Sequence, residues 1–199
     1  MRFAVAFAAG LAMTIALPVS MPAQTKRPDF SGTWVQDTEA SKALTEKKGQ
    51  VWRVAGAGAG AGGARGAAPG EKTVIMQPIT TITQSEAELV IERRFEDEVL
   101  SREVFKLDGS LSVNASRTQS SRTNTIWKGT ALVTSGSRVI DLSRSNATDA
   151  SGKPIAEINE TFVTTRTLMS DGTIQVESRT TRNGTERIQY SVLVRTKAS

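Results

Sequence analysis

The sequence Pro28-Asp29-Phe30-Ser31-Gly32-Thr33-Trp34-Val35 contains the start of the first predicted strand, residues 30–36. Aromatic and β-branched residues are enriched in strands, and a glycine within a strand permits another backbone to approach closely. A short helical stretch follows, then a low-complexity stretch, and then candidate strands as far as residue 196. The sequence therefore predicts an all-β domain whose first strand carries Gly32 and Trp34.

Short candidate strands dominate the chain after Pro78. They are rich in Val, Ile and Thr, which suit half-buried pleated surfaces. Asp-Gly or Asn-Gly pairs at 108–109, 171–172 and 183–184 accept the positive φ angles of tight hairpin turns, and Lys128-Gly129 marks a further turn. The predicted strands are residues 79–84, 88–95, 99–107, 110–115, 122–127, 131–134, 138–143, 156–168, 173–182 and 186–196.

The short connections predict the topology of the sheet. Strands joined by tight turns are antiparallel neighbours, so the order is an up-and-down meander. A meander of this length either closes into a barrel or leaves long exposed edges. Closure is favoured, and the sequence predicts an antiparallel barrel of roughly 8–10 strands.

Two segments after the first strand depart from the strand pattern. Residues 37–48 are helix-friendly, and Asp37 or Thr38 is predicted to cap a short helix there. Residues 55–70 are almost entirely glycine and alanine. Ordering such a segment costs conformational entropy and buries little apolar area, so it is predicted to be a disordered surface insertion.

Residues 1–23 have the pattern of a signal peptide. Arg2 precedes an apolar run at 3–17, Pro18 follows it, and cleavage is predicted after Ala23. The run is shorter than the roughly 20 residues that a bilayer requires, which favours cleavage over the alternative of an uncleaved anchor. We therefore predict a bacterial periplasmic or secreted protein with one domain at residues 24–199, not stably inserted in the membrane.

The composition limits the chemistry. The chain has no histidine and no cysteine, which excludes Ser-His-Asp and Cys-His nucleophiles and His-ligated zinc. The acids at 96–98 lack the Asp-x-Asp-x-Asp spacing of a calcium loop. We predict no catalytic residue, no enzymatic activity, no cofactor and no metal.

The chain has a net positive charge, but its lysines and arginines do not form a cluster in the sequence. The formal net charge is +5, but acids interrupt the arginines, as in the stretch Glu92-Arg93-Arg94-Phe95-Glu96-Asp97-Glu98. Proteins that follow phosphates present clustered cations. We predict no nucleic-acid partner.

The motif at residues 28–34, Pro-Asp-Phe-Ser-Gly-Thr-Trp, resembles the start of bacterial secreted lipocalin-like proteins, which are calycin-type barrels with a Gly-x-Trp first strand. Segments 105–109, 127–132 and 168–174 fit the same pattern, and the resemblance covers most of 28–197 except the Gly/Ala insertion. The Thr-Asp-Tyr segment of lipocalins is missing. The resemblance implies that Trp34, with Gly32 beside it, plugs one end of the barrel and that Arg195 packs over it.

Three arginines alternate in register with apolar residues that are predicted to face the barrel interior. Arg93 shares a face with Leu89 and Ile91, and Tyr190 lies on a similar apolar face near the C-terminus. A buried arginine needs a carboxylate or a ligand anion. The candidate ligand-binding residues are therefore Arg93, Arg102, Arg166 and Tyr190. The alternative is that the arginines extend into water near strand ends, or that a β-bulge exchanges the faces.

These residues lead to two main functional hypotheses. The first is an exported, non-enzymatic binding protein for a small hydrophobic or anionic amphiphilic molecule, held in the barrel with an arginine at its polar head. The alternative is a structural or protein-interaction module of the cell envelope whose barrel is filled by side chains. A cavity of about 300 Å³ or more would favour the first hypothesis. An enzyme ranks third.

Overall fold

A computed structural model describes residues 27–51, 77–149 and 151–196. The predicted signal peptide and the predicted insertion at 55–70 lie outside these residues. The elements in chain order are β1 (Gly32–Asp37), α1 (Thr38–Lys47), β2 (Ile79–Gln84), β3 (Glu88–Phe95), β4 (Glu98–Lys106), β5 (Leu111–Ala115), β6 (Gln119–Lys128), β7 (Ala131–Asp141), β8 (Glu157–Leu168), β9 (Ile174–Arg182) and β10 (Thr185–Arg195).

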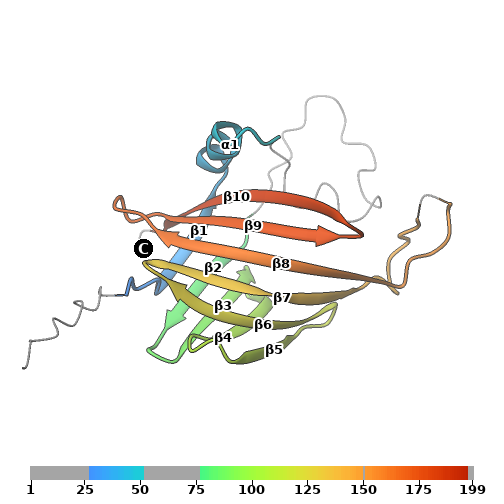
Figure 1. Cartoon of the computed structure of the whole chain (residues 1–199), viewed down its shortest axis with the longest axis horizontal. Coiled ribbons are helices and arrows are strands. Elements are labelled where there is room, and N and C mark those ends of the chain that lie inside the picture. Colours follow the sequence, from blue (N-terminus) through green and yellow to red (C-terminus); the bar gives the residue numbers. More distant parts are fainter. Residues whose placement is uncertain (1–26, 52–76, 150, 197–199) are drawn as a thin grey trace, which may run out of the picture.

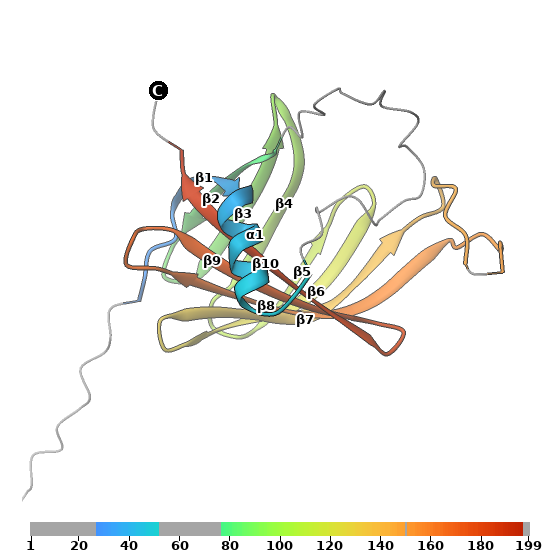
Figure 2. The same ribbon diagram turned by 90° about the horizontal axis from the view of Figure 1, so that it is seen from above.

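The strands form one antiparallel sheet that curls into a nearly closed barrel (Figures 1 and 2). The strand order is β4-β3-β2-β1-β10-β9-β8-β7-β6-β5, so chain neighbours are sheet neighbours except for β4 and β5, which lie at the two ends of the order. β1 also pairs with β10, which joins the start of the domain to its end. The predicted all-β meander is confirmed, and in the part of the chain that the structure describes it forms a nearly closed barrel of ten strands with one short helix.

The helix covers the outer face of the sheet beside β10 (Figure 2). Asp37 is its N-cap, as one of the two predicted candidates, and the Asp37 side chain accepts a hydrogen bond from the Ala40 N–H at 2.9 Å. The Ser41 hydroxyl is buried and accepts a hydrogen bond from the Val192 N–H at 2.8 Å, which fixes the helix to the sheet. Within the described ranges, no helix is long and apolar enough to span a membrane.

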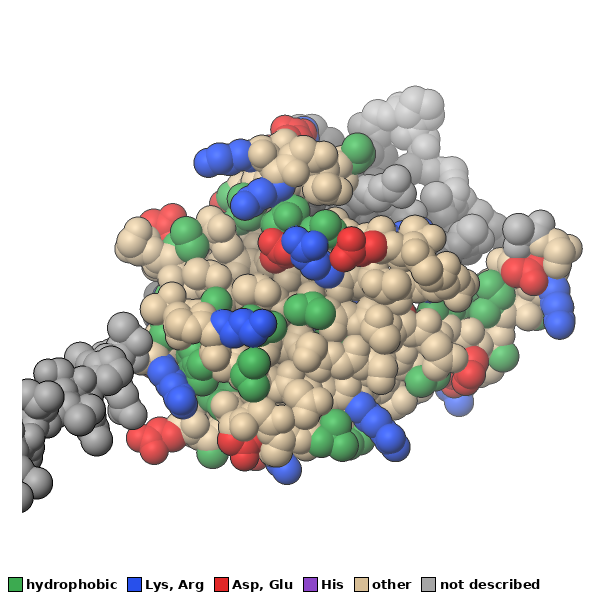
Figure 3. Space-filling model, viewed as in Figure 1, with side chains coloured by type: hydrophobic (Ala, Val, Ile, Leu, Met, Phe, Trp, Pro, Cys, Tyr) green, Lys and Arg blue, Asp and Glu red, His purple; other side chains and the backbone are tan. Residues whose placement is uncertain are grey.

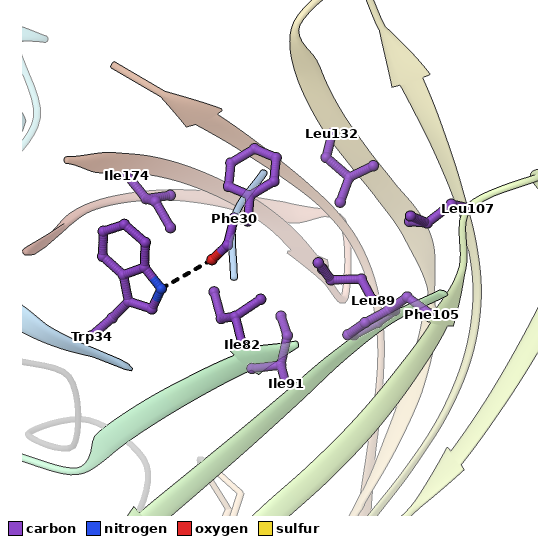
Figure 4. Close-up of a cluster of buried hydrophobic side chains, with 9 residues drawn as sticks. All are labelled: Phe30, Trp34, Ile82, Leu89, Ile91, Phe105, Leu107, Leu132 and Ile174. Atoms are coloured by element: carbon purple, nitrogen blue, oxygen red, sulfur yellow. Dashed lines mark hydrogen bonds between the residues drawn. The ribbon is translucent and has the colours of Figure 1, made fainter. Parts of the chain in front are cut away.

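The apolar core occupies part of the barrel interior (Figure 4). Trp34 is fully buried, and its indole N–H donates to the Phe30 carbonyl at 3.0 Å. Because only one face of each strand points inward, the core is built from alternate residues of strands that lie far apart in sequence. Its buried members are Phe30, Trp34, Ile82, Leu89, Ile91, Phe105, Leu107, Leu132 and Ile174.

One predicted break in the sheet is wrong. The sequence predicts separate strands at 131–134 and 138–143, whereas β7 runs without interruption from Ala131 to Asp141. Gly136 lies at the middle of β7, opposite Thr123 of β6, and a Cβ atom there would lie 2.1 Å from the Arg122 carbonyl oxygen. The glycine therefore serves a close backbone approach within a strand and not a turn.

Turns are present at the predicted positions, and those at 128–129, 171–172 and 183–184 join paired strands. The prediction that the turn at 108–109 joins paired strands is wrong, because no ladder connects β4 and β5. Aspartates organise several turns and loops. The Asp171 carboxylate, for example, accepts a hydrogen bond from the Thr173 N–H at 2.9 Å. These hydrogen bonds hold the pKa of each turn carboxyl below its ordinary value, because they favour the charged form. The lowering affects Asp108, Asp141, Asp149 and Asp171.

The lowered pKa values of these carboxyls make the stability of the fold depend on pH. A carboxyl whose pKa is lower in the folded state stabilises the fold above its ordinary pKa, and this contribution is lost as the pH falls through the folded pKa. We expect the melting temperature to fall between about pH 5 and about pH 2. The melting temperature of a variant with asparagine at Asp108, Asp141, Asp149 and Asp171 should fall less over the same pH range, as measured by circular dichroism. An equal fall in both proteins would contradict the role of the turns.

Candidate functional site

A pocket of about 180 Å³ opens to solvent where β4 approaches β5 and β6. Polar side chains form most of its wall. Those on inner faces of the barrel are Arg93, Ser101, Glu103, Asn114, Gln119 and Ser121. The remaining lining residues are Leu100, Arg102, Ala115, Ser116 and Thr118.

The pocket lies beside the one junction in the barrel that has no backbone ladder, which we call the seam between β4 and β5. Side chains close it. The Asn114 amide accepts a hydrogen bond from the Val104 N–H at 2.7 Å and donates one to the Val104 carbonyl at 3.0 Å. The Ser112 hydroxyl accepts a hydrogen bond from the Lys106 N–H at 2.9 Å. Asn114 and Ser112 thus satisfy main-chain groups of β4 that a neighbouring strand would otherwise satisfy.

An ion pair stands at the inner wall of the pocket. The Arg93 guanidinium lies 3.1 Å from the Glu103 carboxylate, and the exposed fractions of the two side chains are 42% and 18%. The same guanidinium lies 3.5 Å from the Ser101 hydroxyl. Arg93 on β3 and Glu103 on β4 face inward because their strands pair in a register that sets Arg93 opposite Ser101 and Ile91 opposite Glu103.

Arg166 is a buried cation on β8. It is only 8% exposed, its guanidinium lies 5.6 Å from the centre of the Phe105 ring, and it donates a 3.3 Å hydrogen bond to the Thr134 hydroxyl. In the described part of the chain, no carboxylate lies within ion-pair distance of it. The pKa of Arg166 is lowered to about 10, mainly by burial and also by the positive charge of Arg93, while the charge of Glu103 opposes this lowering. Arg166 therefore stays charged at neutral pH.

Buried threonines of β6 and β7 face the interior, and one of them contacts this cation. The Thr134 hydroxyl accepts from Arg166 and lies 3.0 Å from the Thr125 hydroxyl, and both threonines are buried. Thr123, two residues before Thr125 on the same inward face of β6, is fully buried, and its hydroxyl has no hydrogen-bond partner within the described residues. A buried hydroxyl without a partner is unfavourable, so Thr123 lowers the stability of this part of the interior.

A second internal pair is neutral. The Arg138 guanidinium is bonded to the Glu160 carboxylate across β7 and β8, and it lies 5.2 Å from the centre of the Phe162 ring. The Glu160 side chain is 8% exposed. Because each charge has its partner, this pair adds no net charge to the interior.

The structure brings two of the predicted ligand-binding residues to the interior. Arg93 lines the pocket and Arg166 lies deeper, near enough to Arg93 and Glu103 for their charges to act on it. The β3 face predicted to contain Arg93, Leu89 and Ile91 is the inner face.

The predicted inward position of Arg102 is wrong. Arg102 is exposed and lies opposite Glu92 on the outer face, at the rim of the pocket, whereas Glu103 and Phe105 point inward. The alternation of Arg102 with the apolar Leu100 predicted that both face inward. Leu100 is instead 49% exposed, whereas the side chain of the charged Glu103 is only 18% exposed. Leu100 and Val104 of β4 therefore do not mark its inner face, whereas Phe105 does.

Tyr190 also lies away from the interior, contrary to prediction. It lies opposite Glu177 on the outer face, and the Lys48 ammonium at the end of α1 is 6.0 Å from its ring. Burial raises the pKa of the Tyr190 hydroxyl, and the charge of Glu177 raises it further. The apolar face of β10 that holds Tyr190 and Val192 is covered by the helix, not by the barrel core.

The residues of the implied barrel plug lie together. Trp34 is opposite Arg195 in the sheet, and the Arg195 guanidinium lies 4.7 Å from the centre of the tryptophan ring. A Cβ atom at Gly32 would lie 3.0 Å from an Arg195 nitrogen, so the absence of a side chain there makes room for the guanidinium. This arrangement is structural.

Sequence reasoning missed Glu103, Asn114, Thr123 and Thr134. The inner face of β6 is polar, with Gln119, Ser121, Thr123 and Thr125 in alternation, so a search for apolar periodicity passes over it. No group of three or more His, Cys, Asp or Glu side chains that would hold a metal ion is found among the described residues.

Comparisons with known proteins found similarity among solved structures but none among family models or curated sequences. No family model matches it, and no curated protein sequence matches it. Among solved structures, the chain is similar to the zebrafish ileal bile acid-binding protein in complex with cholic acid, at 11% sequence identity and a TM-score of 0.45. The alignment covers 84% of this chain and 98% of the zebrafish protein.

Proposed function

We propose that this protein binds a small anionic amphiphile, with the anionic group at Arg166 and the rest of the molecule extending through the pocket. The observation that carries the proposal is the buried Arg166 guanidinium, which has no carboxylate partner within the described residues. An unpaired buried charge is costly, and a ligand anion would relieve that cost.

The surroundings of Arg166 support an anion in particular. Arg93 adds a second guanidinium from the pocket wall, and the Thr134 hydroxyl is a further polar group beside Arg166. The pocket of about 180 Å³ suits a compact ligand. The exposed Leu100 lies at the pocket and would contact an apolar tail that leaves the barrel there.

The wider biology forms part of the proposal. The signal-peptide pattern at residues 1–23 supports export to the bacterial periplasm or beyond, and the lack of histidine and cysteine supports a non-enzymatic role. Charges of both signs are scattered over the face seen in Figure 3, which supports a partner other than nucleic acid.

One observation favours a second candidate function. The pocket volume of about 180 Å³ is below the roughly 300 Å³ typical of sites for drug-sized ligands. A barrel filled by its own side chains would serve as a structural or protein-interaction module of the cell envelope. Native mass spectrometry of the protein purified from its own source distinguishes the two, since a bound mass that is lost on denaturation supports the binding protein.

Replacement of Arg166 by methionine tests the role of the cation. We expect binding of octyl sulfate, measured by isothermal titration calorimetry, to weaken by more than about tenfold, because the charge that attracts the head group is gone. We expect the melting temperature to rise, since an unpaired buried charge is replaced by an apolar side chain of similar length.

Arg122→Met is the matched control, because Arg122 is exposed on the outer face of β6. It should leave both affinity and melting temperature unchanged. Wild-type affinity in Arg166→Met would remove Arg166 from the site, and absence of binding by the wild-type protein would favour the structural alternative.

A further inference from the structure

Three ionised side chains form one cluster, in which Arg93 and Glu103 line the pocket and Arg166 lies deeper in the barrel. Arg93 and Glu103 are paired at 3.1 Å, and Arg166 reaches from β8 to the ring of Phe105, which is two residues from Glu103 on the same face of β4. Arg166 is buried and donates a hydrogen bond to the Thr134 hydroxyl. The cluster therefore contains two positive charges and one negative charge.

We propose that this cluster selects monovalent over divalent anions and that Glu103 is the residue that determines this specificity. The inference rests on the proposed function and defines its ligand class. The ligand head is a carboxylate, sulfonate, sulfate monoester or phosphate diester, each of which carries one negative charge. Phosphate monoesters, which are mostly divalent above about pH 7, are excluded.

Charge balance explains the selectivity. A monovalent head group neutralises the single excess positive charge of the cluster. A divalent head group leaves one excess negative charge beside Glu103, where surrounding protein screens it less than water would. The more distant Arg138–Glu160 pair does not alter this balance, because it is neutral.

Glu103 also limits the directions from which an anion can be held. Its carboxylate already accepts from Arg93, so an anion at Arg166 meets a repulsive oxygen on the β4 side. A further charged oxygen on the head group would therefore face Glu103.

The test compares two probes with the same tail, octyl sulfate and octyl phosphate, at about pH 8, where the phosphate monoester is divalent because its second pKa is about 6. Calorimetry on the wild-type protein, below the micellar concentration of each probe, should give an affinity for the sulfate at least about tenfold higher. In Glu103→Gln the preference should disappear or reverse, since the cluster then carries two excess positive charges and the glutamine amide oxygen still accepts from Arg93.

Glu92→Gln is the matched control, because Glu92 lies on the outer face of the neighbouring strand, and it should keep the wild-type preference. Equal affinity of the wild-type protein for both probes, or an unchanged preference in folded Glu103→Gln, would overturn the inference while leaving the binding function in place. If neither probe binds the wild-type protein, the proposed function fails and the inference fails with it. Circular dichroism establishes that each variant is folded.

Discussion

Replacement of Trp34 by alanine is expected to lower the free energy of unfolding by about 3–5 kcal/mol. Trp34 is fully buried, packs within the core, and donates to the Phe30 carbonyl at 3.0 Å. Alanine would leave a cavity that surrounding strands cannot fill, because each is held in a ladder with its neighbours. It would also leave the Phe30 carbonyl without its donor and the Arg195 guanidinium without its ring.

Urea denaturation followed by circular dichroism measures this loss. Since domains are stable by only about 5–15 kcal/mol, Trp34→Ala should unfold at a much lower urea concentration. Trp34→Phe is the graded control, because it keeps most of the apolar volume and loses the hydrogen bond. It should lie between the wild-type protein and Trp34→Ala, and a cost below about 1 kcal/mol for the alanine variant would show that Trp34 does not support the core.

Gly136→Ala is expected to destabilise the barrel by about 3 kcal/mol or more, although the change adds a single methyl group. The new Cβ would lie 2.1 Å from the Arg122 carbonyl oxygen and 2.9 Å from the Thr123 Cα. Both are backbone atoms, so no side chain can rotate out of the way. The strands β6 and β7 would have to separate, which would weaken the ladder between them.

The neighbouring residue Ser137 provides the control. It is exposed on the same strand, and Ser137→Ala should change stability by less than about 0.5 kcal/mol. The two variants should therefore differ clearly in melting temperature and in the urea concentration at which half of the protein is unfolded. A cost of Gly136→Ala no greater than that of Ser137→Ala would mean that β6 and β7 do not approach each other so closely.

Most of the fold could be predicted from the sequence because its signals are local. Hairpin turns require positive φ, and Asn183 and Gly184 have φ angles of 50° and 74° at the predicted turn between β9 and β10. The exception is Gly136, where local composition suggests a break and a tertiary backbone approach is the actual cause. Such a contact depends on the neighbouring strand, so no window of sequence around Gly136 reveals it.

The candidate site was predictable only where apolar residues mark the inner face. Arg93 follows Leu89 and Ile91 in alternation, and these positions do point inward. On β4 the same rule selected Arg102 in place of Glu103, because exposed Leu100 imitates a core residue. Which residues face inward there depends on pairing with β3, where the register is irregular between Arg93 and Arg94.

Tyr190 shows a second reason why the site was only partly predicted. Its apolar face is real, but a helix covers it from outside the barrel. Alternation identifies a buried face without saying whether the core or a helix buries it.

The seam gives this barrel an unusual genetic property. Ladder hydrogen bonds belong to the backbone, so almost any side-chain substitution leaves them in place, with proline as the exception. The hydrogen bonds that join β4 to β5 belong to Ser112 and Asn114, so they can be lost through single codon changes. Single mutations can therefore open or restore the barrel at the seam, and selection can adjust closure there without altering the other strands.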